Sequence, residues 1–354
     1  MDIQELLREA VDKKASDLHL LTSSPPLFRI DGALQPFGDT AVSGQDLSDM
    51  FSQMTTAQQG EIFKRELELD FAFSMADGRR VRCNACLQRG DISLALRLLP
   101  PAIPTIDELG LPPLCKDLIV RPRGLIVVTG PTGSGKSTTI AAMIQHLNHT
   151  ERRYIVTIED PVEYVHPSVK CAVSQRELAA DTWSFANALK HVLRQDPDVI
   201  LVGEMRDLET AAAVLTVAET GHLILSTGHA PSAAQSVERI VDLFPPHERA
   251  MAQARLASVL LGVLCQALVP KTGGGRVAAI EVMLANSPVK NLIREGKAHL
   301  LSNTIRTHAN LGMKTLDDAL VDLHRKQQIT WQGVLAFCHD PEEVEKLAGR
   351  GQGK

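Results

Sequence analysis

The stretch from Leu125 to Ser137, LIVVTGPTGSGKS, constrains the fold more than any other part of the chain. An apolar run rich in β-branched residues ends at Gly130, and a glycine-rich loop follows that closes with Lys136 and Ser137. This is the pattern G-x-x-x-x-G-K-[ST], placed between a predicted strand and a predicted helix. A glycine-rich turn could match the pattern by chance, but the strand before it and the helix after it favour a phosphate-binding loop.

Each residue type in this loop has a physical role. Glycines allow the backbone to curl so that several N–H groups face one anion, and the following helix adds the positive end of its dipole. Lys136 can reach the β- and γ-phosphates of ATP, and the Ser137 hydroxyl can ligate Mg²⁺. The predicted nucleotide-binding residues in the pattern are Gly130, Pro131, Thr132, Gly133, Ser134, Gly135, Lys136 and Ser137.

Composition limits the class of protein. A length of 354 residues predicts two domains, and 44% hydrophobic residues are enough for real cores. A net charge of −5 with both signs interspersed gives no support to a general nucleic-acid binder. We see no signal peptide, and the longest apolar stretch, Leu256 to Val269, is interrupted by Gln266 and too short to span a bilayer. We therefore expect a cytoplasmic protein.

The cysteines do not indicate a metal site. Of the six, only Cys83 and Cys86 form a C-x-x-C pair, and no second pair or nearby histidine completes a zinc site. Two residues three apart in an extended segment face opposite sides. We interpret the cysteines as buried or half-buried thiols in a reducing compartment.

The order of helical and extended patterns predicts two domains of different class. Residues 1–99 read as an α+β domain: a helix, a hairpin, a helical stretch at 44–66 and a meander of three alternating strands. Residues 100–113 are rich in proline and read as a linker. Residues 114–348 alternate helix and strand as a parallel α/β sheet does, with strands expected at 125–129, 154–158, 199–202, 223–227 and 277–283. We expect residues 246–266 and 287–348 to be mostly helical and 349–354 to be a disordered tail.

A second chemical signal is DPDVILVGEMRD at 196–207. VILV reads as a buried strand with Glu204 just past its carboxyl end, the edge where α/β sheets bind ligands. A generic Walker B motif has an aspartate at the strand end, where this chain has Gly203. Glu204 can orient the attacking water or hold Mg²⁺ through a water. A solvent-facing helix cap is the alternative, which is weaker because we expect this loop to lie beside the phosphate-loop strand.

Two further strand ends carry polar residues. In IEDPVEYVH the strand ends in Glu159 and Asp160, with Glu163 three residues on, and these carboxylates are candidates for the water-activating base. As an isolated segment, the same residues would suit a turn with solvated charges. His229 follows the strand in TGHLILSTGHA, where an imidazole could sense the γ-phosphate. His222 precedes that strand, so a direct phosphate role is not expected for it.

Arginines of the first domain form the last candidate group. Arg82 and Arg97 lie on adjacent predicted strands, and alternation points both to one face if the hairpin register allows it. A solvated sheet face is the common fate of such residues. The functional alternative is an arginine finger that reaches a phosphate across a domain or subunit interface.

These motifs, in this order, resemble those of the secretion ATPase superfamily of type II secretion and type IV pilus machines, and within it the PilT family of pilus retraction ATPases. The resemblance covers nearly the whole chain. It rests on ASDLHL, RVRCNA, GPTGSGKSTT, IEDPVEYVH, DPDVILVGEMRDLET, ETGHL, RIVDLFP, GGGRVAAIEVML, NLIREGK and LGMKTLDDAL. Assembly-type members usually carry a four-cysteine zinc insertion and a longer N-terminal region; neither pattern is seen in this sequence, so we expect a retraction-type member.

The resemblance implies a PAS-like N-terminal domain, a RecA-like ATPase domain with a helical C-terminal part, and a homohexamer with ATP at the subunit interfaces. By position, Gly133 to Thr138 hold phosphate and Mg²⁺. Glu163 becomes the expected base, Glu204 the Walker B carboxylate and His229 the residue of the His box. Arg82 and Arg97 become arginines that close over the γ-phosphate.

It also implies partners and a place in the cell. We expect a platform protein of the inner membrane, similar to PilC, at the pilus base, and a paralogous retraction ATPase as a further partner. The His box departs from the family pattern GTLHT, because this chain reads STGHA with Gly228 and Ala230 in place of Leu and Thr. Two alternatives stay open on the sequence: an accessory PilU-like ring subunit or adaptor, and a pilus-assembly or type II secretion ATPase.

Overall fold

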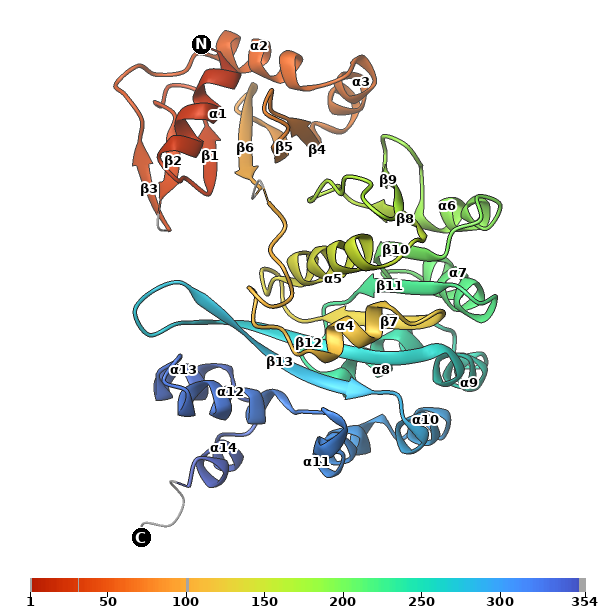
Figure 1. The fold of residues 1–354 in the computed structure, drawn as a ribbon. Helices are drawn as coiled ribbons and strands as arrows, with labels where there is room; N and C mark the ends of the chain where they lie inside the picture. Colours follow the sequence, from red (N-terminus) through yellow and green to blue (C-terminus); the bar gives the residue numbers. More distant parts are fainter. Residues whose placement is uncertain (1, 31, 100–101, 350–354) are drawn as a thin grey trace. The chain divides into compact units, whose positions relative to one another are not determined.

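The computed structural model describes residues 2–30, 32–99 and 102–349. The chain divides into two compact units, which Figure 1 shows in colours that follow the sequence. The first unit comprises residues 1–103 and the short segment Pro161–Val165, and the second comprises Pro104–Asp160 and His166–Lys354. The domain bounds expected from the sequence, 1–99 and 114–348, are not the bounds of these units, and they stay predictions.

The first unit is an α+β structure of three helices and six strands in its described residues. In chain order these are α1 (Ile3–Asp12), β1 (Asp17–Leu20), β2 (Leu27–Ile30), β3 (Ala33–Pro36), α2 (Gly44–Met54), α3 (Ala57–Glu66), β4 (Glu68–Ser74), β5 (Arg80–Gln88) and β6 (Asp91–Leu98).

All six strands of the first unit form one antiparallel sheet in the order β3-β2-β1-β6-β5-β4. It consists of two meanders, β1 to β3 and β4 to β6, joined where β1 pairs with β6. Alternate residues of the strands, such as Leu18, Phe71 and Leu96, pack with apolar residues of α1, α2 and α3 in one core. The helices therefore cover one face of the sheet, and the intervening polar residues occupy the other face.

The helical stretch expected at 44–66 is two helices, because capping residues interrupt it. Ser43 caps α2 and exchanges hydrogen bonds with Asp46. Thr56 caps α3 in the same way with Gln59. Each of these two residue pairs is a capping box, which provides hydrogen-bond partners for N–H groups of the first helical turn. A new helix therefore begins at Ala57 although the apolar periodicity continues.

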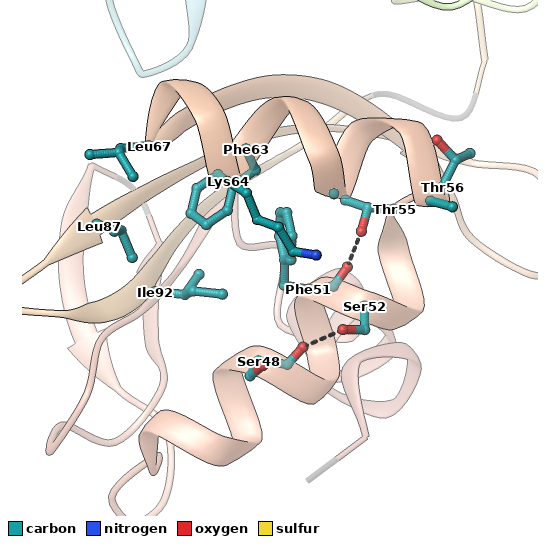
Figure 2. A pocket seen from close by; sticks show the side chains of 12 residues that line it. Ser48, Phe51, Ser52, Thr55, Thr56, Phe63, Lys64, Leu67, Leu87 and Ile92 are labelled. Carbon is teal, nitrogen blue, oxygen red and sulfur yellow. Dashed lines mark hydrogen bonds between the residues drawn. The ribbon is translucent and has the colours of Figure 1, made fainter.

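A groove of about 590 Å³ lies between α2, α3 and the neighbouring strands of the first unit. Figure 2 shows that Phe51, Phe63 and Ile92 line it, with Leu67 and Leu87 at its rim. Leu67 ends α3 in the left-handed region, with φ of 64°, and is 51% exposed. None of the residues that the sequence assigns to nucleotide lines this groove.

The second unit begins with the phosphate-loop strand and its surroundings. Its helices and strands as far as the His box are α4 (Leu114–Ile119), β7 (Gly124–Thr129), α5 (Lys136–Thr150), β8 (Tyr154–Glu159), β9 (Ala172–Glu177), α6 (Phe185–Val192), β10 (Val199–Glu204), α7 (Leu208–Glu219) and β11 (Leu223–Thr227). The remaining elements are α8 (Ala233–Asp242), α9 (Arg249–Val259), β12 (Leu260–Pro270), β13 (Arg276–Leu284), α10 (Ser287–Arg294), α11 (Leu301–Thr307), α12 (Leu316–Arg325), α13 (Trp331–Phe337) and α14 (Pro341–Leu347), with two 3-10 turns at Ala298–Leu300 and Ala309–Leu311.

The sheet of the second unit has seven strands in the order β13-β12-β7-β11-β10-β8-β9. All neighbours are parallel except β12 and β13, which are antiparallel. The alternation of side chains divides the central strands between two cores: Leu125 and Val127 face α6 to α9, whereas Ile126 and Val128 face α4 and α5. This helix–sheet–helix sandwich is the parallel α/β fold predicted from the sequence.

One helical prediction is wrong. We expected residues 246–266 to be mostly helical, and α9 lies there, but it ends at Val259 and the chain continues directly as strand β12 from Leu260. Leu260 to Val269 is apolar on both faces apart from Gln266, because helices cover this central strand on both sides. Such a run has no period of two, so its sequence does not distinguish a buried strand from a buried helix.

The segments at the domain borders are partly described. Ile106 and Leu111, which fall in the predicted linker, are buried in the core that α4 and α5 form with the second sheet. Pro100 and Pro101 lie outside the described residues, as does the predicted tail apart from Gly349. In the described part of the chain, no helix has the length and apolar character needed to cross a membrane.

Candidate nucleotide site

The phosphate loop connects the carboxyl end of β7 to the start of α5. Gly130, Gly133 and Gly135 have φ values of 136°, 78° and 89°, in the region that residues with a Cβ rarely occupy. At Gly130 the space is also filled, because a Cβ would lie 2.2 Å from the carbonyl oxygen of Gln266. The glycines of the sequence pattern are therefore required by the backbone itself.

The start of α5 differs from those of the next three helices along the chain. Ser184, Asp207 and Ser232 cap α6, α7 and α8 with side-chain oxygens, but the residue that precedes α5 is Gly135, which has no side chain to cap the first turn. A helix N-terminus of this kind presents N–H groups and a partial positive charge to an anion. The geometry can thus hold a phosphate at the place that the sequence predicts.

Lys136 lies inside this loop. Its side chain is largely buried, and its Nζ donates hydrogen bonds to the carbonyl oxygens of Gly130 at 2.8 Å and Pro131 at 3.0 Å. The buried hydroxyl of Ser134 has no hydrogen-bond partner among the described residues. Ser137 follows Lys136 with an exposed side chain. An ammonium group, an unpaired hydroxyl and an exposed hydroxyl thus share one loop. All three can donate hydrogen bonds to a phosphate, and a hydroxyl oxygen can ligate a cation that prefers oxygen.

Glu204 ends β10 at the same edge of the sheet. Its carboxylate lies 2.7 Å from Nε of Arg206 and 3.0 Å from Nε2 of His229, and its side chain is 17% exposed. The sequence prediction that Glu204 lies beside the phosphate-loop strand is wrong by one strand, because β11 separates β10 from β7. That intervening strand leads into His229, so Glu204 and His229 meet directly.

The loop after β11 is held by Thr129, to which the sequence analysis gave no role. The Thr129 hydroxyl accepts a hydrogen bond from the Ala230 amide at 2.8 Å and donates to the Ala230 carbonyl at 3.0 Å. A Cβ at Gly228 would lie 3.2 Å from that hydroxyl, so Gly228 lets the loop pack closely on β7. A cavity of about 230 Å³ opens here, lined by residues that include Glu204, Gly228 and His229.

A buried carboxylate fixes the helix that follows this loop. Glu281 on β13 accepts hydrogen bonds from the amides of Ala233 at 2.6 Å and Leu316 at 3.3 Å, the first residues of α8 and α12. Burial raises the pKa of Glu281 above its ordinary value. The only sequence signal for Glu281 is a charged residue inside the apolar strand VAAIEVML, which is unusual for a buried strand.

The carboxylates of IEDPVEYVH belong to different units. Glu159 ends β8 beside β10, and its carboxylate accepts hydrogen bonds from Thr157 at 2.6 Å and Gln175 at 3.1 Å. Glu163 belongs to the short segment of the first unit, where its carboxylate lies 3.8 Å from Nη1 of Arg82. Glu159 and Glu204 therefore share one sheet edge, whereas the assignment of Glu163 as base stays a prediction.

The two histidines also lie apart. His222 precedes β11, at the opposite end of that strand from His229, and its Nδ1 lies 3.0 Å from the Thr220 hydroxyl and 3.2 Å from the carbonyl oxygen of Val217. These local contacts fit a structural role for His222.

Arg82 and Arg97 lie opposite each other on β5 and β6, as alternation and the hairpin predict. The row continues across the polar face, because Arg97 pairs with Asp17 on β1 and Asp17 pairs with Arg29 on β2. Nε of Arg97 lies 2.9 Å from the Asp17 carboxylate. Burial raises the pKa of Asp17, but hydrogen bonds from Ser16 and Arg97 and the charge of Arg97 outweigh it and leave the pKa below its ordinary value.

Arg97→Ala is expected to destabilise the first unit at neutral pH and to make its stability depend less on pH in the acid range. Because the folded-state pKa of Asp17 is lowered, its ionised form stabilises the fold above the unfolded pKa, and this contribution disappears as the pH falls through the folded value. Arg97 is 64% exposed, so we expect a loss of only about 0.5–1 kcal/mol at pH 7. Calorimetry should show a lower unfolding temperature at pH 7 and a shrinking difference from wild type below about pH 4.

Arg82→Ala is the matched control, since Arg82 occupies the same row but forms its ion pair with Glu163. If the unfolding temperature of Arg97→Ala differs from that of wild type by the same amount down to the lowest pH, Asp17 and Arg97 are not linked in this way.

Comparisons with known proteins identify the family of this chain. The family model described as "Type II/IV secretion system protein" matches residues 1–275. The type IV pilus retraction ATPase PilT of Pseudomonas aeruginosa is 44% identical over 342 residues, which cover 97% of this chain and 99% of that protein. A twitching motility protein of Neisseria gonorrhoeae is 42% identical over 348 residues, 98% of this chain and 90% of that protein.

A solved structure described as the pilus retraction motor PilT with bound ADP superposes with a TM-score of 0.89 at 41% identity, and covers 98% of this chain and 99% of that chain. It extends the likeness from the sequence to the fold, with a RecA-like ATPase part that follows an N-terminal β domain. The chain therefore belongs to the family of type II/IV secretion system proteins.

Proposed function

We propose that this chain is a P-loop ATPase motor that couples ATP hydrolysis to the retraction of type IV pili. The observation that carries the proposal is the contact of Glu204 with His229 at the sheet edge that also holds the phosphate loop. A loop that only binds nucleotide does not need a carboxylate and an imidazole held together on neighbouring strands. The full-length likeness to proteins named as retraction motors supports pilus retraction as the work that this motor performs.

Binding of the nucleotide is assigned to the phosphate loop. Backbone N–H groups of residues 133–138 would surround the phosphates, and the Lys136 ammonium would exchange its bonds to loop carbonyls for bonds to phosphate oxygens. The Ser137 hydroxyl, with Glu204 through a water, would hold Mg²⁺, which neutralises charge on the phosphates when bound.

Activation of water is assigned to carboxylates. Glu204 is already oriented by Arg206 and His229, so it can accept a hydrogen bond from a water in a defined direction. Glu163 is the other candidate, and Nη1 of Arg82 lies 3.8 Å from its carboxylate. His229 would report the state of the γ-phosphate to Glu204.

Assembly and cellular place are also part of the proposal. We assign a homohexamer in which Arg82 and Arg97 approach the γ-phosphate and stabilise its charge. The ring would act on a PilC-like platform protein at the inner-membrane base of the pilus, with a paralogous ATPase as a further partner. Relatives named as retraction and twitching motility proteins support this assignment over an assembly ATPase.

Deletion of the gene in its own host tests the proposed function. A retraction motor removes pilin subunits from the fibre, so its loss should leave cells with more surface pili and no twitching motility. Electron microscopy and a surface motility assay measure both properties, and the wild-type gene supplied on a plasmid should restore them. Cells without pili would contradict retraction and favour an assembly ATPase.

A further inference from the structure

Gln266 is a buried polar residue in the middle of an apolar strand. It lies on β12, is 3% exposed, and follows Leu264 on the face of the sheet that packs against α5. A buried amide without partners would destabilise the fold, so its presence demands hydrogen bonds. Both of its side-chain atoms have them: Nε2 donates to the carbonyl oxygen of Ser134 at 2.6 Å, and Oε1 accepts from the Thr139 hydroxyl at 2.7 Å.

We propose that Gln266 is a positioning residue that holds the phosphate loop in its anion-binding conformation; the inference rests on the ATPase function proposed above. The orientation of the amide is fixed by chemistry. The Ser134 carbonyl can only accept, so it must face the NH₂ group, and the Thr139 hydroxyl then donates to the remaining oxygen. Gln266 therefore joins the middle of the loop to the first turn of α5.

The bond to Ser134 controls the direction of a backbone N–H group. A trans peptide is planar, and the carbonyl of one residue points opposite to the N–H of the next. Because Gln266 holds the Ser134 carbonyl toward β12, the N–H group of Gly135 points away from β12. A rotation of this peptide plane would replace that donor by a carbonyl oxygen, which repels phosphate.

The same residue explains why glycines are needed on this side of the loop. A Cβ at Gly135 would lie 2.8 Å from Nε2 of Gln266, and a Cβ at Gly130 would lie 2.2 Å from its backbone oxygen. Two glycines of the nucleotide motif thus leave room for one residue of β12, more than a hundred positions further along the chain. The motif and Gln266 form one structural unit.

Gln266→Met tests the inference, because methionine keeps the length and shape of the side chain and loses both hydrogen bonds. We expect the dissociation constant of Mg-ADP, measured by calorimetric titration on the full chain, to rise about tenfold. Hydrogen exchange of the peptide that covers residues 130–138 should become faster, while peptides from β8 and β10 keep wild-type rates. In turnover assays the KM for ATP should rise more than kcat falls.

Leu264→Met is the matched control, since it places the same side chain two residues earlier on the same face of β12. Such a swap of similar volume is well tolerated, so its affinity for Mg-ADP should equal that of wild type. If Gln266→Met does not fold, Thr139→Val decides instead: loss of the bond to Oε1 should weaken binding in the same direction, by about threefold.

Wild-type affinity and unchanged exchange in Gln266→Met would overturn the inference, as would equal weakening in Leu264→Met. Lys136→Ala separates these outcomes from a failure of the proposed function. If that variant loses Mg-ADP while Gln266→Met keeps it, the nucleotide site stands and only the role of Gln266 falls. If wild type binds no Mg-ADP, both fall together.

Discussion

Lys136→Ala is expected to weaken the binding of Mg-ATP and Mg-ADP by at least about a hundredfold and to abolish turnover. Lys136 supplies the one side-chain positive charge within the phosphate loop, and its bonds to phosphate oxygens would be charge-assisted, which makes them stronger than bonds between neutral groups. Backbone N–H groups would remain, but they carry only partial charges. Titration with a fluorescent nucleotide and a steady-state phosphate-release assay measure the two effects.

Two further variants separate the charge of Lys136 from its contacts with the loop. Lys136→Gln keeps a donor for the carbonyl oxygens of Gly130 and Pro131 but has no charge, so we expect it to bind nucleotide as weakly as the alanine variant. Lys190→Ala removes an exposed lysine from α6 and should bind as wild type does. Unchanged affinity in Lys136→Ala would remove the assignment of this loop to nucleotide.

The elements that form the nucleotide site were predictable because each has a local signal. The strands that end at Thr129, Glu159, Glu204 and Thr227 are apolar runs bounded by turn residues or charges, and their ends lie within two residues of those expected from the sequence. The glycine pattern predicted the start of α5 for the same reason, because its spacing lets a strand turn into a helix around an anion. Local chemistry therefore predicted which residues could bind phosphate.

Contacts between distant segments were not predictable in the same way. Gln266 appeared only as an interruption of an apolar run, and that run was expected to be helix, so nothing connected it with Ser134. Glu281 likewise reaches the start of α8 only because β13 pairs with β12 at the edge of the sheet. Partners of this kind depend on strand order, which hydrophobic periodicity does not encode.

The arginine row illustrates both cases. Alternation and a short hairpin were enough to place Arg82 opposite Arg97, since register follows from the turn between neighbouring strands. That Asp17 pairs with Arg97 could not be foreseen, because β1 and β6 are separated by most of the first unit in sequence and still lie side by side. The structure thereby gives Arg97 a stabilising partner besides the catalytic role proposed for it.

Glu204→Gln is expected to leave nucleotide affinity within about threefold of wild type and to reduce ATP turnover by at least about a hundredfold. Glutamine has the same shape and can still contact Arg206 or His229 through its oxygen, so the loop should keep its conformation. It lacks the charge needed to polarise water, and a positioned general base typically contributes 10²–10⁴-fold. Titration with Mg-ADP and steady-state turnover, with light scattering to size the assembly, distinguish binding, chemistry and ring formation.

Glu209→Gln is the control for this variant, because Glu209 is an exposed carboxylate on α7, close in sequence, and should keep wild-type turnover. If Glu204→Gln turns over ATP at the wild-type rate, Glu204 does not activate water and Glu163 becomes the base to test, with Glu163→Gln. If it loses nucleotide as well as turnover, Glu204 holds the Mg²⁺ needed for binding. If wild type forms a ring that binds nucleotide without turnover, the Glu204–His229 pair is a structural contact and the chain is an adaptor, with Gly228 in the loop beside it as the residue to change first.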